Sequence, residues 1–299
     1  MVFRLILLLP FWSQVYPMQF HPLVIGALYP GIERGLKADL LSTQALSGTA
    51  HPICTAHVVA GHGIVTDVLN VPSDTVAAQL EHVFETQLPT AAKVGIIGDA
   101  AAANHVFEHL STMDGPVVYD LTVSGPSGED VLGQRGLKAA TSHLEVPDLV
   151  TLRRQDAALV AGMEIPSLDD AQVAAQRVAQ QGAAQVLLRC GKLPTHFYET
   201  DNSPPDYALD LFFDGEDFAL FEAPRLANIE ALHGASSGLL LPVLRNLQAG
   251  DAYEEALQKA KGRVSEALRT ANQQPSAHQS STFFDALENA PTLSEVKKD

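Results

Sequence analysis

The sequence predicts an α/β fold with a central, mostly parallel β-sheet and helices on both faces. Short apolar runs, such as residues 23–26, have the composition of strands that are buried on both sides. Amphipathic helical stretches alternate with these runs, which favours right-handed βαβ crossovers. With 299 residues and 46% hydrophobic content, the chain can hold one large domain with a real core or two small ones.

The first half of the chain shows this alternation most regularly. Asp74 and Asp99 are each placed to cap a following amphipathic helix. The expected order is strand, helix, strand, strand, helix, strand, helix and strand, over residues 23–26, 36–46, 52–59, 64–71, 75–88, 93–97, 100–110 and 116–120.

The second half continues the pattern and ends it with a hairpin. A helix is expected to begin at Asp169 or Asp170 and to end at Gly182, because glycine often terminates helices. Asp251 and Glu254 are placed to form a capping box on the last helix. The expected order is strand, helix, strand, antiparallel hairpin and helix, over residues 149–152, 169–182, 185–189, 207–222 and 251–271.

Both ends of the chain are expected to lie outside the folded domain, which we place at residues 18–271. Residues 1–17 hold an apolar run that is too short to span a bilayer and is followed by no small-residue cleavage site. We interpret them as a dispensable extension from an upstream start, with Met18 as the first residue. Gln, Ser, Pro and Lys dominate residues 272–299, which predicts a disordered tail with at most a docking turn at 282–287.

Charge and cysteine content exclude several kinds of partner. A formal net charge of −16 argues against nucleic acid and anionic membranes as main partners. Cys54 and Cys190 are far apart and have no paired spacing, which argues against a disulfide framework or a cysteine zinc site. This cysteine usage fits a reducing compartment, so we expect a cytoplasmic protein.

Two stretches are candidates for binding an anion or a substrate. Residues 232–241 place small residues directly before an apolar run, which predicts a loop that turns into a buried helix. The free N–H groups and helix dipole of such a turn suit a phosphate, and the alternative is a tight turn whose serines only cap the helix. Asp120 ends an expected strand, where ligand sites gather in parallel sheets, and its alternative role is to brace a loop.

The histidines offer weaker candidates. His105 and His109 lie in a His-x-x-Glu-His pattern that matches inverted zinc proteases. The same helix needs its apolar residues for packing, and no third ligand follows. We therefore interpret both histidines as part of an exposed helix face. A metal-dependent hydrolase remains as a third hypothesis for the function. His57 and His62 flank a glycine-containing loop and either line a pocket or have a structural role.

Several stretches, together with the order of the elements, carry a resemblance to a known family. They are Lys37-Ala38-Asp39-Leu40, residues 72–80, residues 93–98, residues 116–120, Leu232-His233-Gly234 and residues 256–268. Over about residues 23–271 the chain resembles the ribokinase-like kinases, specifically the hydroxymethylpyrimidine/phosphomethylpyrimidine kinases of thiamine synthesis, with pyridoxal kinases close by. The resemblance implies a ribokinase-like three-layer sandwich.

The chain departs from the family pattern at motif positions. The family's pyrimidine-binding Gln falls at Ala60, and the Met of its Lys-Ile-Gly-Met run falls at Ile96. The Asn and Glu of its Asn-x-x-Glu motif, linked to magnesium and phosphate, fall at Arg153 and Asp156. The Lys of its Lys-Gly-Gly run falls at Arg189, which keeps the positive charge with another geometry.

The two loops of the family's site also differ here. Its first loop resembles Gly-Ser-Asp-Pro-Ser-Gly-Gly-Ala-Gly, whereas residues 26–35 read Gly-Ala-Leu-Tyr-Pro-Gly-Ile-Glu-Arg-Gly. Its anion hole, Gly-Thr-Gly-Cys, falls on residues 234–237, so Ser237 takes the catalytic position and Ser236 replaces the central glycine. An unassisted serine is a poor base, and Ser236 restricts the backbone where N–H groups must converge on phosphate.

The resemblance implies a small-molecule kinase that uses ATP and Mg²⁺ on a hydroxymethyl group of a heteroaromatic ring. Gly234, Ser236 and Ser237 would hold the transferred phosphate. Nucleotide-binding residues would be Arg153, Asp156, Arg189 and Gly191, with Asp156 helping to organise the metal. The substrate pocket would be lined by Gly26, Ala60, His62, Ile96 and Asp120. A homodimer is expected from the family, and the rival hypothesis is a catalytically inactive relative that binds a ligand or partner through the old pocket.

Overall fold

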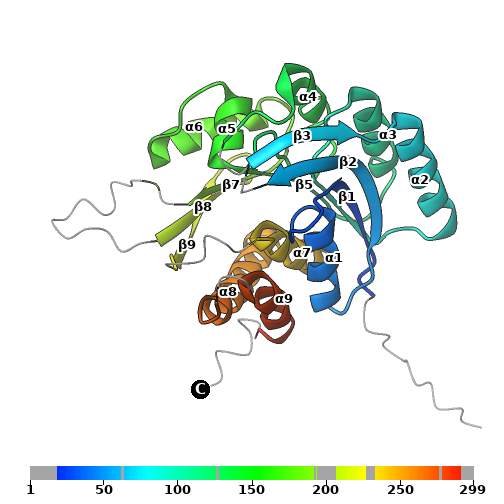
Figure 1. Cartoon of the computed structure of the whole chain (residues 1–299). Helices are drawn as coiled ribbons and strands as arrows, with labels where there is room; N and C mark the ends of the chain where they lie inside the picture. Colours follow the sequence, from blue (N-terminus) through cyan, green and yellow to red (C-terminus); the bar gives the residue numbers. More distant parts are fainter. Residues whose placement is uncertain are drawn as a thin grey trace, which may run out of the picture.

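A nine-stranded sheet runs through the part of the chain that the structure describes (Figure 1). The structure is a computed structural model, and it describes residues 19–61, 64–125, 128–191, 193, 207–226, 233–275 and 278–290. The order of the strands is β3-β2-β1-β4-β5-β6-β7-β8-β9. The strands are β1 Pro22–Leu28, β2 His51–Gly61, β3 Ile64–Asn70, β4 Ala91–Val94, β5 Val117–Asp120, β6 Leu149–Arg153, β7 Val186–Gly191, β8 Tyr207–Phe213 and β9 Phe218–Pro224.

The central strands are parallel and the edges are antiparallel. Pairing is parallel from β2 through β1, β4, β5 and β6 to β7. β3 pairs antiparallel with β2 at one edge, and β8 and β9 form the antiparallel hairpin at the other. The carboxyl ends of the central strands therefore meet along one edge of the sheet, which is where ligands bind in such folds.

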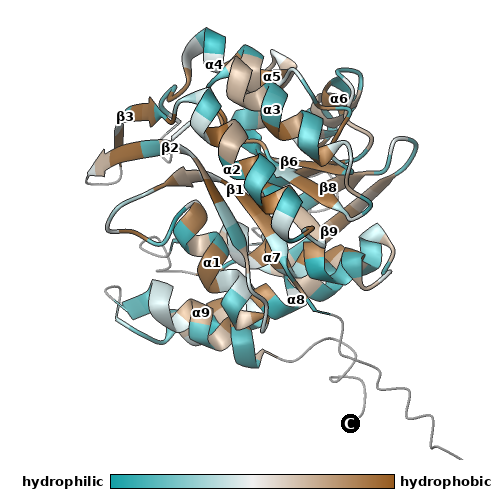
Figure 2. Ribbon diagram, turned by 90° about the vertical axis from the view of Figure 1, so that its right-hand side faces the viewer, coloured by the Kyte–Doolittle hydropathy of each residue, from teal (hydrophilic) through white to brown (hydrophobic). Residues whose placement is uncertain are grey.

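Two helical layers cover the sheet (Figures 1 and 2). The helices are α1 Leu36–Ala45, α2 Ser73–Thr86, α3 Ala100–Leu110, α4 Gly133–Ala140, α5 Arg154–Ala161, α6 Leu168–Ala179, α7 Ala235–Gln248, α8 Tyr253–Asn272 and α9 Gln279–Asn289. Leu23 and Ile25 of β1 pack in one core with α2 to α6, and Val24 packs in a second core with α1, α7, α8 and α9. This confirms the predicted three-layer α/β sandwich.

Helix starts differ from the sequence prediction at several points. Asp99 caps α3 as predicted, because its side chain accepts a hydrogen bond from Ala102 N. α6 is capped by Ser167 instead of by Asp169 or Asp170. α2 begins after Pro72, so Asp74 lies inside its first turn, and α8 has no side-chain cap, so the predicted capping box is wrong. The short helices α4 and α5 were not predicted, because each is only eight residues long.

The predicted disordered tail is wrong over residues 279–289, which form α9. Phe283 and Leu287 lie one helical turn apart and are fully buried, and Phe284 beside them is almost so. Arg263 of α8 donates hydrogen bonds to the carbonyls of Leu287 and Glu288 and so secures the end of α9. Three apolar residues inside a polar stretch are too weak a pattern to predict a helix, and tertiary packing supplies the remaining stability. Residues 1–17 and 291–299 lie outside the described residues.

No helix among the described residues combines the length and the apolar character that a transmembrane span needs.

Replacing Phe283 by alanine should lower the free energy of unfolding by about 3–5 kcal/mol, because a fully buried aromatic side chain is lost from the second core. Urea denaturation followed by circular dichroism measures the change. The matched control is Asp285→Ala, an exposed position of the same helix, which should change the free energy by no more than about 0.5 kcal/mol. Equal effects of the two substitutions would show that α9 does not dock on the domain.

Candidate active site

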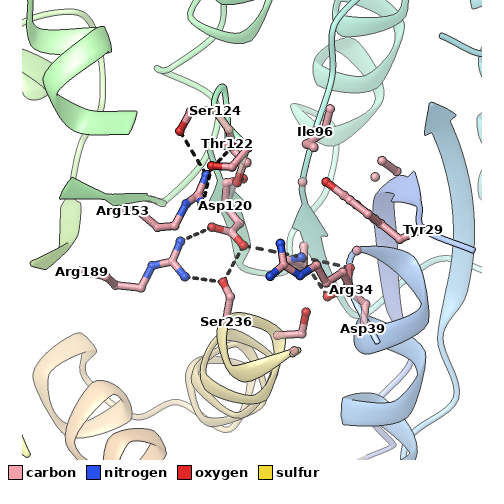
Figure 3. A pocket seen from close by; sticks show the side chains of 18 residues that line it. Tyr29, Arg34, Asp39, Ile96, Asp120, Thr122, Ser124, Arg153, Arg189 and Ser236 are labelled. Atoms are coloured by element: carbon pink, nitrogen blue, oxygen red, sulfur yellow. Dashed lines mark hydrogen bonds and ion pairs between the residues drawn. The ribbon is translucent and has the colours of Figure 1, made fainter. Parts of the chain in front are cut away.

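A cavity of about 140 Å³ lies at the carboxyl edge of the parallel strands (Figure 3). Asp120 ends β5, Arg153 ends β6, and Arg189 lies near the end of β7. The loop after β1 and the first turn of α7 close the cavity from the other side. The fold thus brings side chains from distant parts of the sequence to one place.

The structure gathers most of the residues that the sequence nominated. The cavity wall includes Gly26, Ile96, Asp120, Arg153, Arg189, Gly234, Ser236 and Ser237. Ala60 and Gly191 do not line it: both are exposed, Ala60 in the ribbon of β2 and β3 and Gly191 at the end of β7. The expected place of Ala60 in the substrate pocket is therefore wrong, and the nucleotide-binding role expected of Gly191 stays a prediction. His62 lies outside the described residues.

A run of alternating charges crosses the cavity. Lys93 Nζ lies 2.8 and 3.0 Å from the carboxylate oxygens of Asp39 and 3.9 Å from Asp120. Arg189 Nη2 donates to Asp120 Oδ1 at 2.5 Å. Ser236 Oγ donates to Asp120 Oδ2 at 2.7 Å and accepts from Arg189 Nη1. This run ties α1, β4, β5, β7 and α7 together.

The two carboxylates of this run have different protonation behaviour. Burial raises the pKa of Asp39 above its ordinary value, and Lys93 and a hydrogen bond from Ser237 offset only part of that effect. Burial acts in the same direction on Asp120, but Arg189, Lys93 and the Ser236 hydroxyl together outweigh it and lower the pKa. Asp120 is therefore held as a carboxylate at neutral pH.

Four lining residues with ionisable side chains were not among the site residues expected from the sequence: Tyr29, Arg34, Asp39 and Lys93. Lys93 had a usable signal, because it begins the otherwise apolar run of residues 93–97, and a buried lysine needs an acidic partner. Asp39, between Ala38 and Leu40 on α1, carried the matching signal. Nothing in the local sequence indicated that Tyr29 and Arg34 would turn inward.

Asp156 does not occupy a metal-binding position. Its side chain is fully buried behind the cavity wall. Oδ1 accepts hydrogen bonds from Val123 N, Ser124 N and Ser124 Oγ at 3.1, 2.9 and 2.7 Å, and Oδ2 accepts from Arg153 Nε at 2.7 Å. Mg²⁺ needs carboxylate oxygens with free lone pairs facing the phosphates. These residues do not fit a protein-held Mg²⁺, so the expected role of Asp156 in organising the metal is wrong.

The first turn of α7 has the geometry that the small-residue stretch predicted. Gly234 has φ 89°, and a Cβ there would lie 2.4 Å from Phe284 Cζ of α9, so only glycine fits. No side chain caps this helix, because its N-cap residue is Gly234, and the Ser236 hydroxyl is bound to Asp120. The interpretation that its serines are helix caps is therefore wrong, and Gly234, Ser236 and Ser237 of this turn line the cavity.

The other histidine candidates lie elsewhere. His109 on α3 uses Nδ1 for a hydrogen bond with the carbonyl of His105, and neither residue lines the cavity. His57 is exposed on β2. Within the described part of the chain, no three His, Cys, Asp or Glu side chains gather in a way that could hold a metal ion.

A second cavity, of about 230 Å³, adjoins the first. It lies between β8, β9, α7 and α8, and its wall contains apolar side chains such as Leu239, Val264 and Leu268. Lys261 pairs with Asp210 in this wall, and Arg225 and Arg269 add positive charge. Arg189 and Ser236 belong to the walls of both cavities, so they stand at the boundary between a polar chamber and an apolar one.

The fold and the site define an α/β protein that binds small molecules at the carboxyl edge of a parallel sheet, with a helix N-terminus between two cavities. The chain belongs to the phosphomethylpyrimidine kinase family, whose model matches residues 33–282. It is 27% identical over 239 residues to a hydroxymethylpyrimidine/phosphomethylpyrimidine kinase of Aquifex aeolicus, covering 79% of this chain and 89% of the relative. The resemblance seen in the sequence is confirmed.

Solved structures show the same fold. Staphylococcus aureus pyridoxal kinase in complex with AMP-PCP matches with a TM-score of 0.72 and 24% identity, covering 85% of this chain and 90% of that one. The phosphomethylpyrimidine kinase of Clostridium difficile 630 matches with a TM-score of 0.68 and 20% identity, covering 83% and 99%.

The Asp39–Lys93 pair gives a prediction about stability. Lys93→Met should lower the free energy of unfolding by about 3–5 kcal/mol, because it leaves the Asp39 carboxylate buried without its cation. Adding Asp39→Asn should recover at least about 1 kcal/mol of that loss. Urea denaturation of the wild type, the two single variants and the double variant measures the coupling between Asp39 and Lys93. Strictly additive effects of the two substitutions would contradict the coupling.

The loss of stability caused by Lys93→Met should depend on pH in a defined direction. The raised pKa of Asp39 means that the folded state takes up a proton more readily than the unfolded chain. The stability that this proton uptake contributes is present below pH 3.8, the ordinary pKa of an aspartate. It is lost as the pH rises through the raised pKa of Asp39. The stability deficit of Lys93→Met should therefore be larger at high pH than at low pH.

Proposed function

We propose that this protein is an ATP-dependent phosphotransferase that phosphorylates a hydroxymethylpyrimidine or a related heteroaromatic alcohol. The observation that carries the proposal is the pair of cavities that share Arg189 and Ser236. A phosphoryl group passing from a nucleotide in one cavity to an acceptor in the other must cross that boundary. Membership of the phosphomethylpyrimidine kinase family supports the same reaction.

The apolar cavity is the place for the nucleotide. Its lining suits an adenine ring, and the pyridoxal kinase that shares this fold was solved with AMP-PCP. Arg189 neutralises negative charge on the transferred group, and its buried Nε has no hydrogen-bond partner among the described residues. Mg²⁺ that accompanies ATP supplies further charge neutralisation. We assign no residue of this chain to it.

The polar cavity is the place for the acceptor. Its volume of about 140 Å³ is close to that of an engineered cavity of about 150 Å³ that holds benzene, so one six-membered ring fits. Tyr29 and Ile96 offer ring-sized contacts in its wall. The Asp120 carboxylate orients the acceptor hydroxyl, because its lowered pKa keeps it ionised at neutral pH. Phosphoryl transfer depends chiefly on such positioning and on charge neutralisation.

Turnover should be measurable as ADP formation with hydroxymethylpyrimidine, its phosphate or pyridoxal as acceptor. Asp120→Asn should lower kcat by about 100-fold, because the orienting carboxylate is lost. The control is Asp67→Asn, an exposed carboxylate on β3, which should leave kcat unchanged. No turnover with any of the three acceptors, together with no ATP-induced thermal shift, would reject the proposal and favour the inactive relative.

Ser237→Ala tests the residue at the family's catalytic position. The Ser237 hydroxyl hydrogen-bonds Asp39, not Asp120, so it acts on the site through the buried charges. We expect kcat to fall by roughly tenfold or less, well short of the effect of Asp120→Asn. An effect equal to that of Asp120→Asn would instead assign Ser237 a direct part in the transfer.

We place the protein in the cytoplasm and in a homodimer. The cytoplasmic location is inferred from both cysteines, which are free thiols.

The homodimer is inferred from the ribbon of β2 and β3. It leaves Val59, Ile64 and Leu69 each about half exposed at a sheet edge, where a second copy would cover them. Sedimentation should give twice the monomer mass, and Leu69→Lys should shift the protein toward monomer; a wild-type monomer would contradict the pairing.

A further inference from the structure

Arg189 is a cation at the boundary of the two cavities, and its terminal nitrogens already have partners. Nη2 donates to Asp120 Oδ1 at 2.5 Å, and Nη1 donates to Ser236 Oγ (Figure 3). The buried Nε has no hydrogen-bond partner among the described residues. A guanidinium binds a phosphate best through a planar fork of two N–H groups. The fork formed by the two terminal nitrogens of Arg189 therefore holds partners from this chain.

Ser236 closes these contacts into a ring. A hydroxyl can donate one hydrogen bond while it accepts others. Ser236 Oγ donates to Asp120 Oδ2 at 2.7 Å while it accepts from Arg189. Asp120, Arg189 and Ser236 are thus joined by three hydrogen bonds, each of which involves an ionised group. Such bonds are stronger than those between neutral groups, so the ring resists opening.

The other cation beside Asp120 offers no substitute for Arg189. Lys93 Nζ lies 3.9 Å from Asp120 and binds both carboxylate oxygens of Asp39, at 2.8 and 3.0 Å. These two cations and two carboxylates balance in charge. An anion that reaches the first turn of α7 therefore meets paired groups at this place.

The backbone that carries Ser236 is held in place. A Cβ on Gly234 would lie 2.4 Å from Phe284 Cζ and 3.0 Å from the carbonyl oxygen of Glu33, so the turn is packed tightly against α9 and the loop after β1. In the family pattern, Gly-Thr-Gly-Cys, a glycine stands at the position of Ser236 and provides no hydroxyl. The ring is therefore a property of this chain, and it opens by rotation of its side chains.

We propose that Ser236 competes with the phosphates of the nucleotide for Arg189, so that its hydroxyl weakens nucleotide binding and raises the KM for ATP. A polyphosphate gains the full fork of Arg189 only after the Ser236 hydroxyl has turned away. The hydrogen bonds lost in the ring then offset part of the binding free energy. The inference deepens the proposed function and rests on it for the place of the nucleotide.

Isothermal titration with AMP-PCP and with inorganic tripolyphosphate tests the competition without turnover. Ser236→Ala should bind both ligands about tenfold tighter than the wild type, because a hydrogen bond to a charged group no longer has to be broken. Ser236→Thr, which keeps a hydroxyl, should bind both ligands as the wild type does. Ser236→Gly, which carries the family's residue, should also bind more tightly and covers the case in which Ser236→Ala does not fold.

Steady-state kinetics separates this role from a merely structural one. In Ser236→Ala the KM for ATP should fall by about the same factor, whereas the KM for the acceptor should stay unchanged. The matched control is Thr75→Ala, which removes an exposed hydroxyl from the first turn of α2, a helix that borders neither cavity. It should leave the affinity for both ligands unchanged.

The outcomes distinguish the inference from the proposed function. Unchanged or weaker binding of both ligands by Ser236→Ala, or binding of neither ligand by any of these proteins, would overturn the inference. Turnover with an ATP KM that Ser236→Ala does not change would also overturn it and leave the proposed function standing. Tighter binding of tripolyphosphate by Ser236→Ala in a protein that phosphorylates none of the acceptors would support the inference while rejecting the proposed function.

Discussion

The site depends above all on the run of alternating charges formed by Asp39, Lys93, Asp120 and Arg189. Charges in a protein interior are tolerated only when they are paired, so each member fixes the position of the next. The run begins on α1, crosses the ends of β4 and β5, and ends on β7. Through Ser236 it also holds the first turn of α7. A single electrostatic network thus connects the wall of the first cavity with the residues that it shares with the second cavity.

Packing fixes the start of α7 from the opposite side. Phe284 and Phe283 of α9 lie against Gly234 and Gly238, where any side chain larger than hydrogen would collide with them. Ser280 adds a hydrogen bond to the backbone of His233. The first turn of α7, which lines both cavities, is therefore held between a charged network and an apolar helix. Neither alone would fix both its position and its direction.

The departures from the family pattern form a connected set of contacts. Arg153 and Asp156, which replace an Asn and a Glu, pair with each other and brace the loop at Ser124. Ser236, which replaces a glycine, uses its hydroxyl to join Asp120 to Arg189. The positive charge at these positions is therefore carried by Arg153 and Arg189, whose side chains are held in place by the contacts just described. These substitutions make a site whose internal hydrogen bonds and ion pairs run between side chains of the chain itself.

The sequence by itself determined the sandwich, the parallel centre of the sheet and the place of the site. Hydrophobic periodicity and strand-end chemistry are local properties, so Asp120 and the small-residue turn at Gly234 could be found by pattern, whereas Arg189 was expected only from the family resemblance. Only the tertiary structure decided which charges meet. The partner of Lys93 is 54 residues away in Asp39, Arg34 turns toward His233 across 199 residues, and α9 gains its helix from α7 and α8. Asp156 and Ala60 were misplaced for the same reason: whether a side chain faces a cavity depends on long-range packing, which no local pattern records.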